Sequence, residues 1–176
     1  MFKAKRTYRH PPDRNLGDRQ QRMYDFMREN PVGVLSTVGP DGDPHGSVIY
    51  YGVDDALTVT FLTRLNTRKF DNLRRQPRVM LTVCDPETQA VLQVRGEAEQ
   101  VADSEEINAV AARTLGASLH TSEYGLPPIS KLEAGPFVGV RIIPKQLRMA
   151  VFARPDAGDY SDLFESVESF ELPVEP

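Results

Sequence analysis

Short segments rich in apolar and β-branched residues recur along most of this chain, separated by residues that favour turns. The clearest is 57–63, in which Leu57, Val59 and Phe61 alternate with threonines. Alternation with a period of two indicates a strand with one buried face. The same reasoning predicts strands at 32–38, 47–53, 57–63, 78–84, 90–101, 137–143 and 146–152. Six or seven antiparallel strands interrupted by helices are typical of a small closed or partly closed barrel, so we expect a mainly β fold.

Three segments have apolar residues at helical spacing instead. They predict helices at 18–29, 67–75 and 104–115. Asp18 and Ser104 are the expected N-caps of the first and third helices, and Asn30-Pro31 ends the first.

Glycine and proline mark the expected breaks between strands. The sequence GPDGDP at 39–44 predicts a turn, and Gly96, inside the longest strand, predicts a bulge or sharp bend. Pro144-Lys145 is expected to separate the last two strands.

Charge is distributed unevenly over the 176 residues, a length that suits one domain with a core. We divide the chain into an irregular basic arm (1–17), a barrel domain (18–153) and an acidic tail (154–176). The oppositely charged ends either pair, within one chain or between subunits, or remain solvated. The net charge of −4 gives no reason to expect nucleic acid as a partner. The basic side chains near the start are Lys3, Lys5, Arg6, Arg9, Arg14, Arg19 and Arg22.

Several function classes have no support in the sequence. No apolar run is long enough to cross a membrane and no signal peptide is evident, so a cytoplasmic location is the default expectation. The single cysteine, Cys84, lies in a strand pattern and is expected to be buried. Three scattered histidines lack the spacing of a metal site, and no hydrolase, P-loop or dinucleotide motif is present.

The most informative segment joins the strand 57–63 to the helix 67–75. Arg68 and Lys69 fall in the first helical turn, where cations oppose the helix dipole unless an anion is present. The hydroxyls of Thr63 and Thr67 and the amide of Asn66 lie beside them. Backbone N–H groups, hydroxyls and cations together form a phosphate site. The alternative is a solvated basic helix that packs against the acidic tail.

Three stretches resemble the flavin-nucleotide-binding split β-barrel family, of which pyridoxamine 5'-phosphate oxidase is the best-known member. They are VGVLSTVGPDGDPHGSVIYY (32–51), LTVTFLTRLNTRKFDNLRRQPRVMLTV (57–83) and VLQVRGEAEQV (91–101), and the resemblance covers roughly residues 18–153. It implies an antiparallel split β-barrel of six to seven strands with flanking helices. It also implies FMN as cofactor, bound at the interface of a homodimer.

The resemblance also implies a set of cofactor-binding residues. Thr67, Arg68 and Lys69 would hold the FMN phosphate, and the strand from Ser47 to Tyr51 would run along the isoalloxazine ring. Gln93 would reach the ring from the second subunit, or else is an outward-facing strand glutamine. The full candidate set is Ser47, Val48, Ile49, Tyr50, Leu62, Thr63, Asn66, Thr67, Arg68, Lys69 and Gln93.

The implied activity is that of an FMN-dependent oxidoreductase acting on a small molecule, with NAD(P)H as a possible partner. The alternatives are a relative that binds F420 or haem on the same barrel, and a flavin-binding module without enzymatic activity. Pyridoxine phosphate is not the expected substrate, because the chain has no Trp and its C-terminal end lacks the Trp and Arg pattern of vitamin B6 oxidases. No catalytic residue is assigned. His45 is expected at a strand edge bordering the cofactor.

Overall fold

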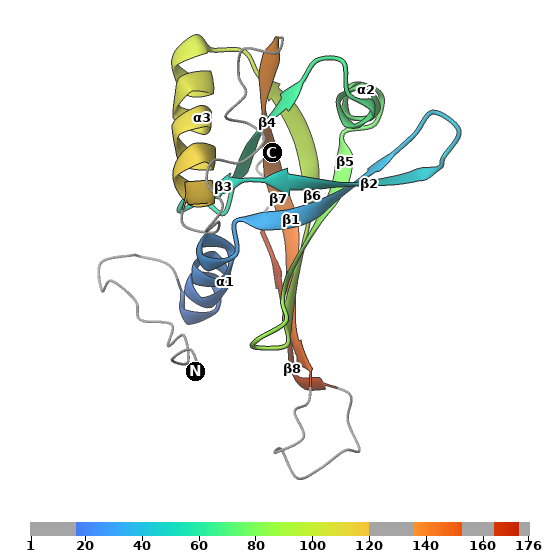
Figure 1. The fold of residues 1–176 in the computed structure, drawn as a ribbon. Coiled ribbons are helices and arrows are strands. Elements are labelled where there is room, and N and C mark those ends of the chain that lie inside the picture. The colour runs from blue at the N-terminus through green and yellow to red at the C-terminus, as the bar shows by residue number, and fades with distance from the viewer. Residues whose placement is uncertain (1–16, 120–135, 153–163, 173–176) are drawn as a thin grey trace.

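The computed structural model describes residues 17–119, 136–152 and 164–172 (Figure 1). Within these ranges the mainly β fold with flanking helices is confirmed. The helices are α1 (Asp18–Glu29), α2 (Arg68–Arg75) and α3 (Ser104–Leu119). The strands are β1 (Val32–Val38), β2 (Pro44–Tyr50), β3 (Gly52–Val53), β4 (Val59–Arg64), β5 (Arg78–Asp85), β6 (Ala90–Val101), β7 (Phe137–Phe152) and β8 (Phe164–Glu171).

All eight strands belong to one antiparallel sheet, whose order is β2-β1-β5-β6-β7-β4-β3. The long strand β7 pairs with β6 on one side, and with β4 and then β8 on the other. Strands β2 and β3 lie at opposite ends of this order, yet Tyr51 alone separates them in the chain. The sheet therefore curls until its two ends meet, which makes a partly closed barrel.

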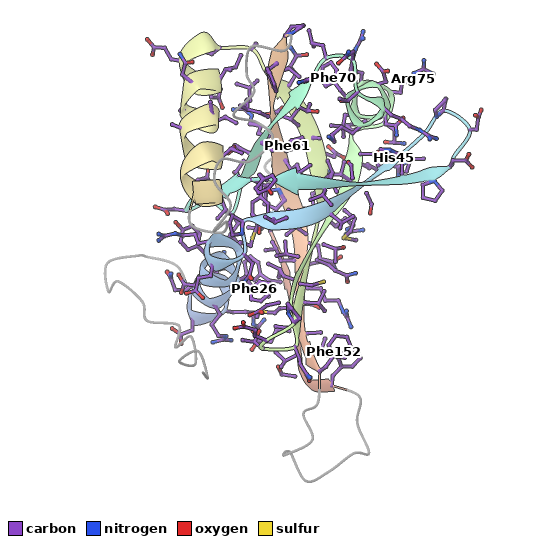
Figure 2. All side chains as sticks on the ribbon, viewed as in Figure 1. Phe26, His45, Phe61, Phe70, Arg75 and Phe152 are labelled. Carbon is purple, nitrogen blue, oxygen red and sulfur yellow. The ribbon has the colours of Figure 1, made fainter. Side chains whose placement is uncertain are left out.

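The core fills the inside of this curl, and α1 covers one end of it. Met23, Phe26 and Met27 of α1 are fully buried, as is Phe61 of β4, and Figure 2 shows both phenylalanines. The hydroxyl of Tyr51 lies 2.7 Å from the carbonyl oxygen of Asn30, where α1 ends. Burial raises the pKa of this hydroxyl far above its ordinary value, so the bond is a structural one.

Proline does not break the last strand, contrary to the sequence prediction. Residues 137–152 form one strand, in which Pro144 faces Gly96. The register between β6 and β7 shifts between Arg95 and Gly96, which confirms the predicted bulge. A Cβ at Gly96 would collide with the carbonyl oxygen of Ile143, so only glycine fits there. The bulge accommodates the proline and lets β7 continue.

The strand predicted at 47–53 is also displaced. Strand β2 begins at Pro44 and ends at Tyr50, and β3 is a separate pair of residues. The hairpin between β1 and β2 closes over Gly39, whose N–H donates to the carbonyl of Asp43 at 2.8 Å. Gly42 adopts a φ of 84° in this turn, a conformation that favours glycine. The turn is therefore shorter than the predicted one, and β2 starts three residues earlier.

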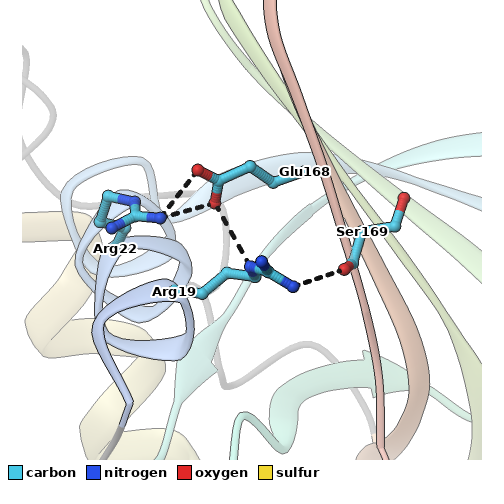
Figure 3. A network of polar contacts seen from close by, with 4 residues as sticks. All are labelled: Arg19, Arg22, Glu168 and Ser169. Atoms are coloured by element: carbon cyan, nitrogen blue, oxygen red, sulfur yellow. Dashed lines mark hydrogen bonds and ion pairs between the residues drawn. The ribbon is translucent and has the colours of Figure 1, made fainter.

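Part of the acidic tail forms β8, a strand that the sequence analysis did not predict. It pairs with β7 and faces α1, where Arg22 Nη2 lies 2.7 Å from Glu168 Oε1 (Figure 3). Arg19 donates to the carbonyl of Ser169 at 3.3 Å. For these residues the oppositely charged ends pair within one chain. The five more N-terminal basic residues lie outside the described ranges.

Three local predictions were wrong. Cys84 is exposed rather than buried, because Val83 and Asp85 take the inward positions of β5. The N-cap of α1 is Gly17, without a side-chain hydrogen bond from Asp18. At α3 the carboxylate of Asp103 accepts the N–H of Glu106 at 2.8 Å, in the capping role predicted for its neighbour. No helix in the described ranges is long and apolar enough to span a bilayer.

Candidate functional site

The start of α2 is built by a threonine cap. Thr67 is the N-cap, and its hydroxyl oxygen accepts the N–H of Phe70 at 3.4 Å. The same hydroxyl donates to the carbonyl of Arg64 at 2.9 Å. Thr63 Oγ1 lies 3.1 Å from Thr67 Oγ1, and since the Thr67 proton is already used, Thr63 is the donor. Both predicted hydroxyl donors are therefore engaged within the protein, and the free donors of this turn are backbone N–H groups.

The two cations of this first turn have no acidic partner among the described residues. Arg68 is exposed, and its guanidinium reaches toward Gly39 in the β1–β2 turn. Lys69 is half-buried, and burial lowers the pKa of its amine. A partly buried cation at the positive end of a helix is destabilised, and a bound anion would relieve this.

A chain of hydrogen bonds holds α2 against the β1–β2 hairpin. Asn72 Nδ2 donates to Thr37 Oγ1 at 3.0 Å, and that hydroxyl donates to the carbonyl of His45 at 3.3 Å. Lys69 lies three residues before Asn72 and so shares its side of the helix. Arg68, four residues before Asn72, lies on this side as well. Both cations therefore lie on the side of α2 that faces the hairpin.

Two buried polar atoms lie on the hairpin face that packs against α2. His45 pairs with Thr37 and Ser47 with Leu35, so both side chains lie on the hairpin face that carries Thr37. His45 Nδ1 and Ser47 Oγ are buried without a hydrogen-bond partner in the described part of the chain. Figure 2 shows His45 on the hairpin beside α2. Each such atom costs about 1–3 kcal/mol unless a ligand or water satisfies it.

The structure places six of the eleven predicted cofactor-binding residues on neighbouring elements: Ser47, Thr63, Asn66, Thr67, Arg68 and Lys69. They come from the first turn of α2, the end of β4 with the connection that follows it, and the face of β2 that packs against α2. Asn66 is exposed in the connection to α2. Leu62 pairs with Gly139, on the sheet face that packs against Ile107 of α3, and so lies away from this region. The polar chain through Asn72 and Thr37 was not predicted, because it depends on how two separate elements pack.

Gln93, Val48 and Tyr50 lie on the opposite face of the sheet, and Ile49 is buried in the core. Val48 pairs with Val34, Val34 with Thr82, and Thr82 with Gln93, so the four side chains form one row across β2, β1, β5 and β6. Val48 is 63% exposed and Val34 44%. Within one chain, Gln93 therefore does not reach the region between α2 and the hairpin.

A partly closed antiparallel barrel with flanking helices defines the class of split β-barrels, and comparison with known proteins gives the family. The family model described as pyridoxamine 5'-phosphate oxidase matches residues 20–149. The chain therefore belongs to this family. A pyridoxine/pyridoxamine 5'-phosphate oxidase of Cupriavidus pinatubonensis is 33% identical over 86 residues, which are 49% of this chain and 41% of that protein. The match thus spans less than half the length of that relative.

Solved structures share the fold. A conserved hypothetical protein of Mycobacterium tuberculosis has a TM-score of 0.63 at 25% identity, covering 88% of this chain and 99% of the other. An FMN-binding protein of Nostoc punctiforme related to pyridoxamine 5'-phosphate oxidase has a TM-score of 0.55 at 16% identity, covering 91% and 99%. A haem-binding protein of Mycobacterium smegmatis has a TM-score of 0.56 at 20% identity, covering 83% and 57%.

Proposed function

We propose that this protein binds FMN between α2 and the β1–β2 hairpin and acts as an oxidoreductase on a small molecule. The observation that carries the proposal is that unpaired cations and buried polar atoms without hydrogen-bond partners occur on two elements that pack together. Among the described residues, Arg68 and Lys69 have no ion-pair partner, and His45 Nδ1 and Ser47 Oγ, on the hairpin face that packs against α2, have no hydrogen-bond partner. A ligand with a phosphate and a polar ring edge would neutralise the cations through its phosphate and hydrogen-bond the two buried atoms through its ring.

Each side chain has a role in this proposal. Lys69 and Arg68, with the free N–H groups of their turn, bind the phosphate. Ser47 and His45 hydrogen-bond polar atoms of the cofactor. When bound, FMN supplies the hydride chemistry, and the protein orients the ring and excludes water. FMN is preferred over FAD for two reasons. The two cations and the N–H groups of their turn suit a terminal phosphate, and the chain has no sequence motif that binds a pyrophosphate.

The proposal includes a homodimer. The row of Val48, Val34 and Gln93 lies on a face with further exposed apolar surface at Val38. Exposed valines that adjoin on neighbouring strands favour an interface. A two-fold interface over this face would bury the valines of both subunits and carry Gln93 to the cofactor of the second subunit.

The identity of the ligand tests the cofactor assignment directly. Protein purified without added cofactor is examined by absorption spectroscopy, and the ligand released on denaturation is identified by mass spectrometry. We expect FMN. Haem, F420 or FAD as the major species would overturn the assignment, and the haem-binding relative in fold makes haem the first alternative. Flavin-bound protein that neither accepts electrons from NAD(P)H nor reduces any acceptor would instead support a non-enzymatic flavin-binding module.

Light scattering tests the dimer. We expect about twice the chain mass of 19.7 kDa for the wild type. Replacing both Val34 and Val48 with Lys should yield monomers, because the lysines place charges in the proposed interface. Both valines are exposed in one chain, so the substitutions leave its core intact. The matched control, Val167→Lys, alters a valine of similar exposure on β8. A wild-type monomer that retains FMN tightly would contradict the interface.

A further inference from the structure

Two polar side chains are buried where α2 packs against the β1–β2 hairpin. Asn72 of α2 is 2% exposed and Thr37 of β1 is 1% exposed. The Thr37 hydroxyl accepts from Asn72 Nδ2 at 3.0 Å and donates its own proton to the carbonyl of His45 at 3.3 Å. Apolar side chains of the same shape would stabilise this contact about as well, because burying polar groups costs free energy that their hydrogen bonds only offset. What the polar pair adds is direction, since a hydrogen bond fixes both distance and angle.

The other inward side chains of α2 cannot supply that direction. Phe70 and Leu73 are buried in the hydrophobic core. Their contacts hold the helix against the sheet, but apolar contacts have no preferred direction and leave its rotation loosely set. A helix of eight residues is also too short to keep its conformation alone in water. Among the described residues, the bond from Asn72 is the side-chain hydrogen bond that ties α2 to the hairpin.

This bond lies directly behind the proposed phosphate site. Lys69 precedes Asn72 by three residues and Arg68 by four, so both cations share its side of the helix. A rotation of α2 that broke the Asn72 bond would therefore also move the amine of Lys69 and the guanidinium of Arg68. The second bond of Thr37 ends on His45, whose ring Nδ1 is buried without a partner in the described part of the chain. One hydroxyl thus connects the helix that carries the cations to the strand that carries His45.

We propose that Asn72 and Thr37 are positioning residues of the cofactor site. Asn72 fixes α2 so that Lys69 and Arg68 meet the phosphate, and Thr37 fixes α2 and the backbone of His45 relative to each other. The assignment rests on the proposed function, because it takes those cations as the phosphate ligands. It gives the two residues different effects. Losing the Asn72 amide disturbs the helix alone, since Thr37 keeps its bond to His45, whereas losing the Thr37 hydroxyl disturbs both sides of the site.

Riboflavin, which has the ring system of FMN but no phosphate, separates these effects. The full-length protein is freed of retained flavin and titrated with each ligand, and quenching of flavin fluorescence gives the affinity. In Asn72→Leu, we expect FMN affinity to fall about tenfold, roughly the loss of one charge-assisted hydrogen bond, and riboflavin affinity to stay unchanged. Thr37→Val should weaken both ligands, and FMN by more. Thr37→Ser keeps the hydroxyl and should bind both ligands as the wild type does.

The matched control is Gln21→Leu on α1, which lies away from α2 (Figure 1). Gln21 Nε2 donates to Asp25 Oδ1 at 3.0 Å, so this variant also removes a buried amide that donates to a side-chain oxygen. It should change neither affinity. Urea denaturation gives the stability of every variant, so a loss of affinity can be compared with a loss of stability. Asn72→Ala removes the amide without adding bulk and gives the same comparison if Asn72→Leu does not fold.

The ratio of FMN affinity to riboflavin affinity decides between the outcomes. If the Asn72 variants lose both affinities equally, Asn72 has a structural role only and the proposal is wrong. If they keep the FMN preference of the wild type, the position of the cations does not depend on Asn72, which also overturns it while the proposed function stands. A wild type that binds riboflavin as tightly as FMN would instead contradict the phosphate site of the proposed function, and the positioning role with it.

Discussion

Two helices of this protein carry basic residues near their starts, and the surroundings of those residues differ. On α1, Arg19 and Arg22 meet Glu168 and the carbonyl of Ser169, so their charges are satisfied within the chain. On α2, Arg68 and Lys69 meet no carboxylate among the described residues, and the buried atoms on the hairpin face that packs against α2 lack partners as well. Basic residues thus hold two elements together at α1, whereas at α2 they remain available to an anion.

Removing the unpaired cations of α2 is the most severe test of this difference. Arg68→Ala with Lys69→Ala should weaken FMN binding by about 3 kcal/mol or more, roughly 150-fold, because each charge-assisted contact contributes about 1.5–3 kcal/mol. The affinity is measured by quenching of flavin fluorescence. The stability of the apoprotein should fall little or rise, because the cations oppose the helix dipole.

The control for this double variant is Arg19→Ala with Arg22→Ala. It also removes two cations, but from the contact between α1 and β8, where they are already paired. We expect unchanged FMN affinity. If the two double variants lost affinity equally, general electrostatics would explain the binding and the proposed site would be wrong.

The same contrast shows which features a sequence can predict. Helices α1 and α2 and strands β1 and β6 were located closely, because the Asn30-Pro31 break, the helical spacing of apolar residues and the alternation within strands are local signals. Strand β8 was missed because its place depends on the free edge of β7, which only the folded sheet provides. The continuity of β7 through Pro144 was missed for a similar reason, since the bulge at Gly96 lies on another strand.

In the candidate site, too, some features have local sequence signals and others depend on how elements pack. The cations and threonines of 63–69 were predicted from their order in the chain. The engagement of both threonine hydroxyls, and the burial of His45 Nδ1 and Ser47 Oγ without partners, depend on how the hairpin packs against α2. No periodicity in the sequence records that packing.

A substitution at the N-cap of α2 is expected to change stability by an intermediate amount. Thr67→Val keeps the shape of the side chain but removes the acceptor of the Phe70 N–H and the donor to the Arg64 carbonyl. We expect the free energy of unfolding to fall by about 1–2 kcal/mol. Urea denaturation of the apoprotein measures it, and Thr67→Ser should retain most of the stability. A Val variant as stable as the wild type would show that the cap contributes nothing to positioning the cations.

The pH dependence of FMN binding tests Lys69 separately from Arg68. Burial lowers the pKa of Lys69 in the folded apoprotein below the ordinary value of about 10.4. Between these two values the unfolded chain binds more protons than the folded one, so the stability of the apoprotein should rise with pH. FMN favours the charged amine, so its affinity should fall as pH rises through the lowered pKa. Lys69→Arg stays charged and should abolish this decline, and a decline that persists in the variant would assign it to another group.

The smallest effect is expected at the corner between α1 and β8. Arg22 and Glu168 are 48% and 32% exposed, and ion pairs as exposed as this contribute about 0–1 kcal/mol. Glu168→Gln should therefore lower the free energy of unfolding by less than about 1 kcal/mol, because β8 keeps its backbone pairing with β7. The difference between variant and wild type should shrink further near 1 M salt, where screening is strong. Urea denaturation at low and high salt measures it, with FMN affinity followed in parallel. If Glu168→Gln weakened FMN binding, the α1–β8 corner would be coupled to the cofactor site, and the distinction between a structural and a ligand-binding set of cations would not hold.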